Sequence, residues 1–148
     1  MSAGAGRSGE LDDHAIGAAL AQLRAAPMSR KTAMLAALLI DAGTGRLFRR
    51  GTAGDVLVFR EALARAAPEL GLVMALADMR EDGPRLVLEA VAVDAADYPG
   101  LSEADYMVSL YNGATVPRVL VALPDGTRLQ AADLLAAAAA QLADRLAR

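Results

Sequence analysis

Helical spacing of apolar residues marks three stretches of the chain. The first runs from about residue 10 to residue 26 and ends before Pro27. The second runs from 55 to 67, with Asp55 as its N-cap and a proline after its end. The third is an Ala- and Leu-rich segment from about 131 to 147. Residues 1–9 show no such spacing, so we expect a flexible N-terminal tail there and one domain over residues 10–148.

The stretch from residue 30 to residue 50 fits two structures. Ser29 is suited to cap a helix that ends at Gly43, because the apolar residues between them follow a 3.6-residue period. The same residues also fit a hairpin that turns at residues 42–45. Alanine and leucine favour the helix, and within this stretch no β-branched apolar residue precedes Ile40. We therefore expect a helix with Gly43 as its end.

The second half of the chain favours a sheet, because eight of the ten valines lie between residues 73 and 121. Apolar runs at 72–77 and 86–93 flank the turn-forming residues 80–84 and predict a hairpin. Ser102 and a glycine after Asn112 predict a short helix over residues 103–111. Pro117 opens another expected strand, which a turn at 124–126 joins to a short returning strand at residues 128–129.

These elements predict an α+β fold, with a mostly antiparallel sheet over about residues 71–129 covered by helices, including the C-terminal helix. Two of the predicted elements have more apolar surface than a single neighbouring element can bury. The 86–93 strand is apolar on both faces apart from Glu89, and the 131–147 helix is apolar around most of its circumference. We expect this helix to pack between two surfaces, and one face of the strand to need another helix or another subunit.

Composition narrows the possible classes of protein. Of the 148 residues 55% are hydrophobic, and 35 residues are alanine, so large anchoring side chains are scarce. The net charge of −3 and a pI near 5.1 argue against nucleic-acid binding. No apolar run reaches the roughly 18 residues of a membrane span, and the N-terminal residues do not resemble a secretory signal. The chain has no cysteine, so we expect a cytoplasmic protein without disulfides.

Catalytic side chains are scarce as well. His14 is the only histidine, and it lies beside Asp12 and Asp13 at the expected start of the first helix. Adjacent acids there are explained by the helix dipole. We therefore expect no catalytic residue, no metal site and no cofactor.

Two segments are candidate binding sites. The Gly-rich segment 43–54 contains Arg49 and Arg50 and precedes a helix N-terminus, which is an arrangement that suits a small anionic ligand. The second segment runs from residue 98 to residue 118. It holds all three tyrosines together with an asparagine and an arginine that can bind polar groups: Tyr98, Tyr106, Tyr111, Asn112 and Arg118. The alternative for the tyrosines is that they pack their helix on the sheet.

Two hypotheses follow for function. The leading one is a non-catalytic interaction or accessory module, adaptor-like or chaperone-like, that acts as a homodimer or larger assembly and binds another protein. The alternative is a small-ligand-binding protein or an enzyme, in which the tyrosines, Asn112 and Arg118 hold a polar or anionic ligand. A concave pocket lined by these side chains would favour the alternative.

Overall fold

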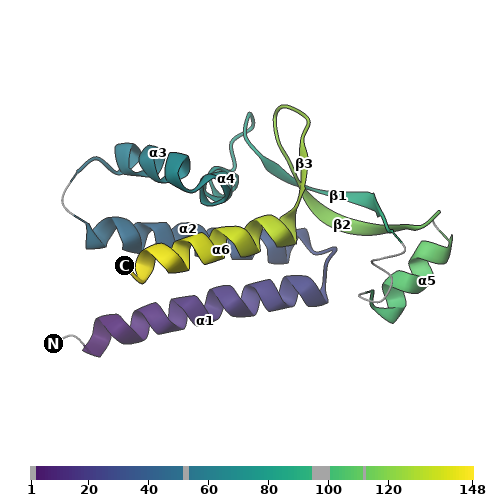
Figure 1. The fold of residues 1–148 in the computed structure, drawn as a ribbon, viewed down its shortest axis with the longest axis horizontal. Coiled ribbons are helices and arrows are strands. Elements are labelled where there is room, and N and C mark those ends of the chain that lie inside the picture. Colours follow the sequence, from purple (N-terminus) through teal and green to yellow (C-terminus); the bar gives the residue numbers. More distant parts are fainter. Residues whose placement is uncertain (1–2, 52–53, 95–100, 112) are drawn as a thin grey trace.

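A computed structural model describes residues 3–51, 54–94, 101–111 and 113–148. Over these residues the chain forms, in order, α1 (Ala3–Ala25), α2 (Arg30–Arg50), α3 (Val56–Ala66), α4 (Pro68–Ala77), β1 (Arg85–Ala92), α5 (Glu103–Tyr111), β2 (Thr115–Ala122), β3 (Arg128–Gln130) and α6 (Ala131–Leu146). Helices thus accompany a three-stranded antiparallel sheet (Figure 1). The α+β class and the C-terminal helix are both confirmed.

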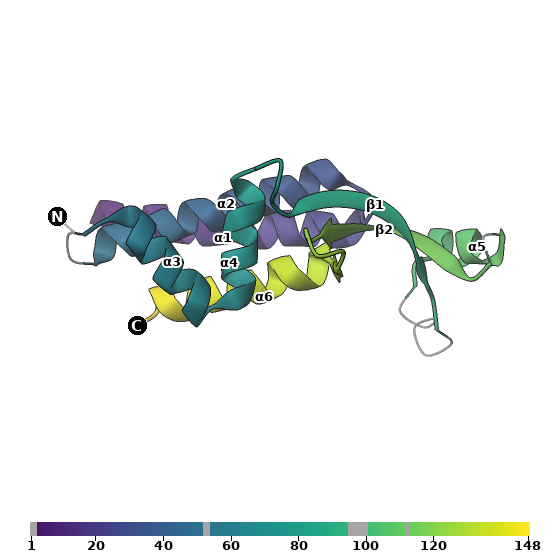
Figure 2. The same cartoon turned by 90° about the horizontal axis from the view of Figure 1, so that it is seen from above.

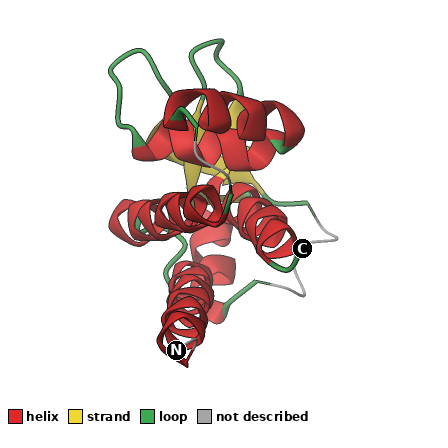
Figure 3. Ribbon diagram, turned by 90° about the vertical axis from the view of Figure 1, so that its left-hand side faces the viewer, coloured by secondary structure: helices red, strands yellow, loops and turns green. Residues whose placement is uncertain are grey.

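Five of the helices form a layered body. In Figures 1 and 3, α2 and α6 occupy the middle, α1 lies on one side of them, and α3 and α4 lie on the other. The largest fully buried apolar side chains come from these layers and from β2: Leu23, Ile40, Leu70, Leu76, Leu135, Leu142, Val73 and Val121. α6 contacts α1, α2 and α4 and also reaches the sheet, so the expectation that this helix packs between two surfaces is confirmed.

The stretch from residue 30 to residue 50 is a helix, and its hairpin alternative is excluded. The Thr32 N–H donates to Ser29 Oγ at 3.1 Å, which confirms the expected N-cap. The predicted end at Gly43 was wrong, because α2 continues to Arg50. Gly43 is buried against α6, where an added Cβ would lie 2.4 Å from Leu142 Cδ2. This glycine therefore permits two helices to approach closely and does not end one.

The strand expected at residues 72–77 was also wrong, because these residues belong to α4. Pro68 occupies the first turn of this helix, and the leucines, alanines and methionine that follow are good helix formers. α4 packs against α2, α3 and α6, and its buried residues are Leu70, Val73, Met74, Leu76 and Ala77. An apolar run this short does not distinguish a buried strand from a buried helix.

The strand expected at 86–93 is confirmed as β1, but its partner differs from the expected one. β1 pairs with β2 in antiparallel register, with Val87 opposite Leu120 and Glu89 opposite Arg118. β3 then pairs with the end of β2 through the turn at residues 124–126, in which the Leu123 N–H donates to Thr127 O at 2.9 Å. The order β1-β2-β3 leaves β1 at an edge of the sheet.

The β1–β2 ribbon extends beyond the helical body, and α5 lies at its far end (Figure 2). Val119 and Val121 of β2 belong to the core, whereas Leu88 of β1 is 47% exposed. The apolar residues of β1 are therefore only partly covered within one copy of the chain.

The first helix begins earlier than expected. α1 starts at Ala3, whereas the sequence predicted a tail over residues 1–9 and a helix start near residue 10. The interspersed glycines of this segment break the apolar spacing from which the start was predicted.

Candidate functional site

The short helix α5 lies in the connection between β1 and β2 and packs against β2. Ser102 caps it, since the Asp105 N–H donates to Ser102 Oγ at 3.1 Å and the Tyr106 N–H donates to Ser102 O at 2.9 Å. The predicted helix over residues 103–111 is thereby confirmed. In Figures 1 and 2 this helix is the element farthest from the helical body.

The side of α5 that faces the rest of the chain carries polar side chains beside the half-buried Val108. Ser109 is the buried residue of this helix, at 2% exposure, and its hydroxyl donates to Tyr106 O at 2.7 Å. Asp105 forms an ion pair with Arg118 of β2, at 2.8 Å from Oδ2 to Nη2. Both side chains of this pair are about four-fifths buried, with 18% and 20% exposure. Polar contacts therefore make a large part of the attachment of α5 to the sheet.

The opposite side of α5 is apolar and exposed. Four large side chains gather on this side, where Leu110 is four positions from Tyr106 and three from Met107: Tyr106, Met107, Leu110 and Tyr111. Their exposed fractions are 45%, 47%, 58% and 82%. A surface helix normally buries its apolar side against the core and turns its polar side outward. In α5 the larger apolar side chains are instead the exposed ones. We name these four side chains the α5 outer face.

The structure separates the residues that the sequence grouped as one site. Tyr106 and Tyr111 lie on the α5 outer face, whereas Arg118 lies on the inner side in its ion pair. Tyr98 and Asn112 lie outside the described residues. Met107 and Leu110 were not among the predicted site residues, although their helical spacing from the tyrosines is a usable signal.

Arg118 lines a groove of about 960 Å³ at the base of α5. The lining comes from the α1–α2 turn, the start of α5, β2 and the start of α6, and its polar members include Arg24, Ser29, Asp105, Gln130 and Asp133. Neither Tyr106 nor Tyr111 is part of this lining. The groove therefore does not bring the predicted tyrosines and Arg118 together.

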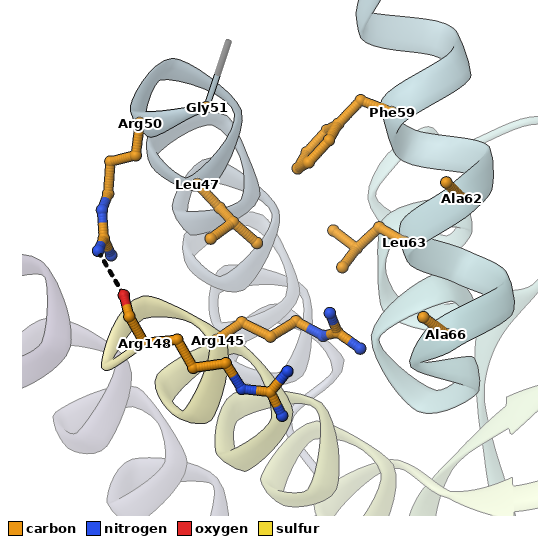
Figure 4. Close-up of a pocket in the computed structure, with 9 residues that line it drawn as sticks. All are labelled: Leu47, Arg50, Gly51, Phe59, Ala62, Leu63, Ala66, Arg145 and Arg148. Carbon is orange, nitrogen blue, oxygen red and sulfur yellow. Dashed lines mark hydrogen bonds between the residues drawn. The ribbon is translucent and has the colours of Figure 1, made fainter.

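Arg49 and Arg50 lie far from α5, in the last turn of α2. Because residues 43–50 are helical, they do not form the Gly-rich loop on which the anion site was predicted. Arg50 lines a separate cavity of about 500 Å³ between α2, α3 and α6, together with Leu47, Phe59, Leu63, Arg145 and Arg148 (Figure 4). Arg50 itself donates to the backbone oxygens of Leu146 and Arg148, so its guanidinium holds the end of α6.

Other kinds of site find little support in the described part of the chain. It holds no group of three or more histidine, cysteine or acidic side chains placed to bind a metal ion. None of its helices combines the length and the apolar character that a membrane crossing needs. A comparison of the chain with models of known protein families, with curated proteins and with solved structures finds no match.

Proposed function

We propose that this chain is a non-catalytic protein-interaction module that acts as a homo-oligomer and binds a protein partner through the α5 outer face. The observation that carries the proposal is the orientation of α5. Its buried side holds Ser109 and the Asp105–Arg118 ion pair, while four large apolar side chains face outward. Tyrosine, methionine and leucine side chains gathered on a protruding helix are typical of a contact surface.

The attachment of α5 also supports a contact role. An ion pair that is four-fifths buried favours one orientation of the helix, because rotation would separate the two charges and leave Arg118 mostly buried without its partner. The Ser102 cap adds a second fixed point at the start of the helix. A helix held in this way presents its apolar side before the partner arrives, so less entropy is lost when the complex forms.

The chemistry of α5 favours a protein over a lipid surface. Membrane-bound amphipathic helices carry lysine or arginine beside their apolar side, and these residues attract anionic lipids. α5 contains Glu103 and Asp105 and no basic residue. The partner that complements the apolar side of α5 is a protein with an apolar groove that accepts a helix.

Two double variants test the proposal. Met107→Ser with Leu110→Ser removes two side chains of the α5 outer face. Leu57→Ser with Val58→Ser removes two side chains of α3 that are 67% and 62% exposed, and serves as the matched control. Both variants should change the free energy of unfolding by less than about 0.5 kcal/mol per substitution, because all four positions are at the surface.

The measurement is the mass of the complex purified from cells that naturally contain the chain, by light scattering and mass spectrometry. We expect a stoichiometric protein partner with the wild-type chain and with the α3 control, and at least about a tenfold loss with the α5 variant. Equal recovery with the α5 variant would refute the proposal. Recovery of a small molecule in place of a protein would favour the groove that Arg118 lines.

A further inference from the structure

The edge strand β1 has an unpaired outer side. The Val93 N–H donates to Ala114 O at 2.8 Å, so the odd-numbered residues of this strand direct their backbone groups toward β2. The N–H and C=O groups of Leu86, Leu88 and Ala90 therefore point away from the sheet. Within the described residues these outward N–H groups have no hydrogen-bond partner.

The side of β2 that faces away from β1 is, by contrast, protected where the short strand β3 does not cover it. Pro117 has no N–H to offer there, and its carbonyl oxygen accepts from Arg118 Nη1 at 2.9 Å. The Val119 N–H donates to Pro27 O at 3.1 Å. Proteins commonly protect sheet edges by such devices, and Leu86, Leu88 and Ala90 of β1 have neither of these two.

Two copies of β1 can pair only in a few antiparallel registers. Even-numbered residues must face even-numbered residues so that their outward groups form hydrogen bonds. The two-fold axis that relates the two strands, called the centre below, then lies at Val87, Leu88 or Glu89. A centre at Glu89 sets two carboxylates opposite each other at a Cα distance of about 4.5 Å. A centre at Leu88 places Glu89 opposite Val87 of the second copy.

A centre at Val87 has the best charge complementarity. It places Arg85 opposite Glu89 of the second copy on the same face of the sheet, and two-fold symmetry repeats this pair. Arg85 is exposed, and within the described residues its side chain has neither an ion pair nor a hydrogen bond. Glu89 is already oriented by Arg128, at 3.1 Å from Oε1 to Nε.

The same register also covers apolar surface on the other face. Leu88 of each copy then lies opposite Leu86, which lines a groove of about 510 Å³ together with Met34, Leu76 and Met79. Leu88 is 47% exposed and Met79 is 64% exposed in the single chain. We propose that two copies of this chain pair along β1 about a two-fold axis at Val87 and so join their sheets into one of six strands.

The absence of cysteine makes a clean test available, because Val87→Cys introduces a single thiol per chain. Residues at position 87 form a non-hydrogen-bonded pair in this register, and their Cα distance of about 4.5 Å suits a disulfide. We expect most chains to become covalent dimers under mild oxidation. Val91→Cys is the control: it is half-buried on the same face, and its two copies would lie about 27 Å apart.

Charge reversal provides a second measurement that needs no new covalent bond. Arg85→Glu sets like charges opposite each other twice, so we expect sedimentation to show at least about a tenfold rise in the dimer dissociation constant. Arg65→Glu changes the net charge equally at an exposed position of α3 and should leave the dimer unchanged.

Three outcomes would overturn the inference: a monomer at micromolar concentration, efficient crosslinking of a Leu88→Cys or Glu89→Cys variant in preference to Val87→Cys, or an unchanged dimer with Arg85→Glu. The inference rests on the proposed interaction role but concerns a different surface. If the β1 tests fail while the α5 variant still loses its partner, the β1 pairing is wrong and the proposed binding of a partner through the α5 outer face stands. If the β1 tests succeed while the α5 variant retains its partner, the β1 pairing stands and binding through the α5 outer face is wrong.

Discussion

Leu142 of α6 packs directly on Gly43 of α2, where an added Cβ would lie 2.4 Å from Leu142 Cδ2. Both residues are buried between the two helices at the centre of the body. The small residue on one helix thus receives the large residue on the other. Because the chain is rich in alanine and poor in large side chains, close approach of helices at such points is a main source of its packing.

Gly43→Ala should therefore destabilise the fold by about 1–3 kcal/mol, because the new methyl group forces Leu142 out of its position. Gly45→Ala, two residues along the same helix, is the matched control. Its new Cβ meets only the end of the flexible Arg49 side chain, at 3.4 Å, so the better helix propensity of alanine should stabilise the fold by about 0.5–1 kcal/mol. Urea denaturation measures both changes, and equal effects of the two substitutions would contradict this packing.

Gln141 of α6 caps the N-terminus of another helix, α4. The residue before α4 is Ala67, which has no side-chain oxygen, so the Leu70 N–H donates instead to Gln141 Oε1 at 3.0 Å. Gln141 Nε2 donates in turn to Glu69 Oε2 at 2.7 Å. Gln141→Ala should lower the free energy of unfolding by about 1–2 kcal/mol, as loss of a helix cap does. Ala140→Ser, at the exposed neighbouring position, should change it by less than about 0.5 kcal/mol. A loss of similar size in both variants would exclude the capping role.

Local signals in the sequence predicted most of the elements. Asp55 as the N-cap of α3 is confirmed by the bond from the Leu57 N–H to Asp55 Oδ1 at 2.7 Å, and the turn at residues 124–126 is confirmed as well. These features depend on residues within a few positions of each other, so the local sequence is enough to predict them.

The features that the sequence did not predict depend on distant residues. The sequence does not predict α4 as a helix, because its cap comes from Gln141, about 70 positions later. It does not predict that α2 continues past Gly43, because the packing partner of this glycine, Leu142, is about 100 positions away. The sequence singled out the tyrosine segment, but the ion pair of Asp105 with Arg118 joins α5 to a strand that lies 13 positions later, and no local pattern indicates it.

Asp125 provides a prediction for pH dependence. Hydrogen bonds from Thr127, first from its side chain and then from its backbone N–H, favour the charged carboxylate and lower the pKa of Asp125 below its ordinary value of 3.8. Any stability from these bonds is thus present above about pH 4 and is lost as the pH falls through the pKa of the folded state. Thr127→Ala should raise the pKa of Asp125 toward its ordinary value in an NMR titration. An unchanged pKa would show that the Thr127 side chain is not its cause.

The Asp105–Arg118 ion pair should stabilise the attachment of α5. Asp105→Asn removes one charge and leaves that of Arg118 four-fifths buried, so we expect a loss of about 1–2 kcal/mol, less than for a fully buried pair. Asp144→Asn is the control, since the Asp144–Arg148 pair is about two-thirds exposed and should contribute at most about 0.5 kcal/mol.

The location of the effect separates this prediction from general destabilisation. Amide hydrogen exchange should become faster in α5 when Asp105 is replaced, and should change little in α2 and α6, because only α5 loses a support. Capture of the protein partner should also fall, although Met107 and Leu110 are still present, since their helix is no longer held in one orientation. If exchange in α5 is unchanged, the ion pair does not position this helix, and the rigid presentation of the α5 outer face must have another cause.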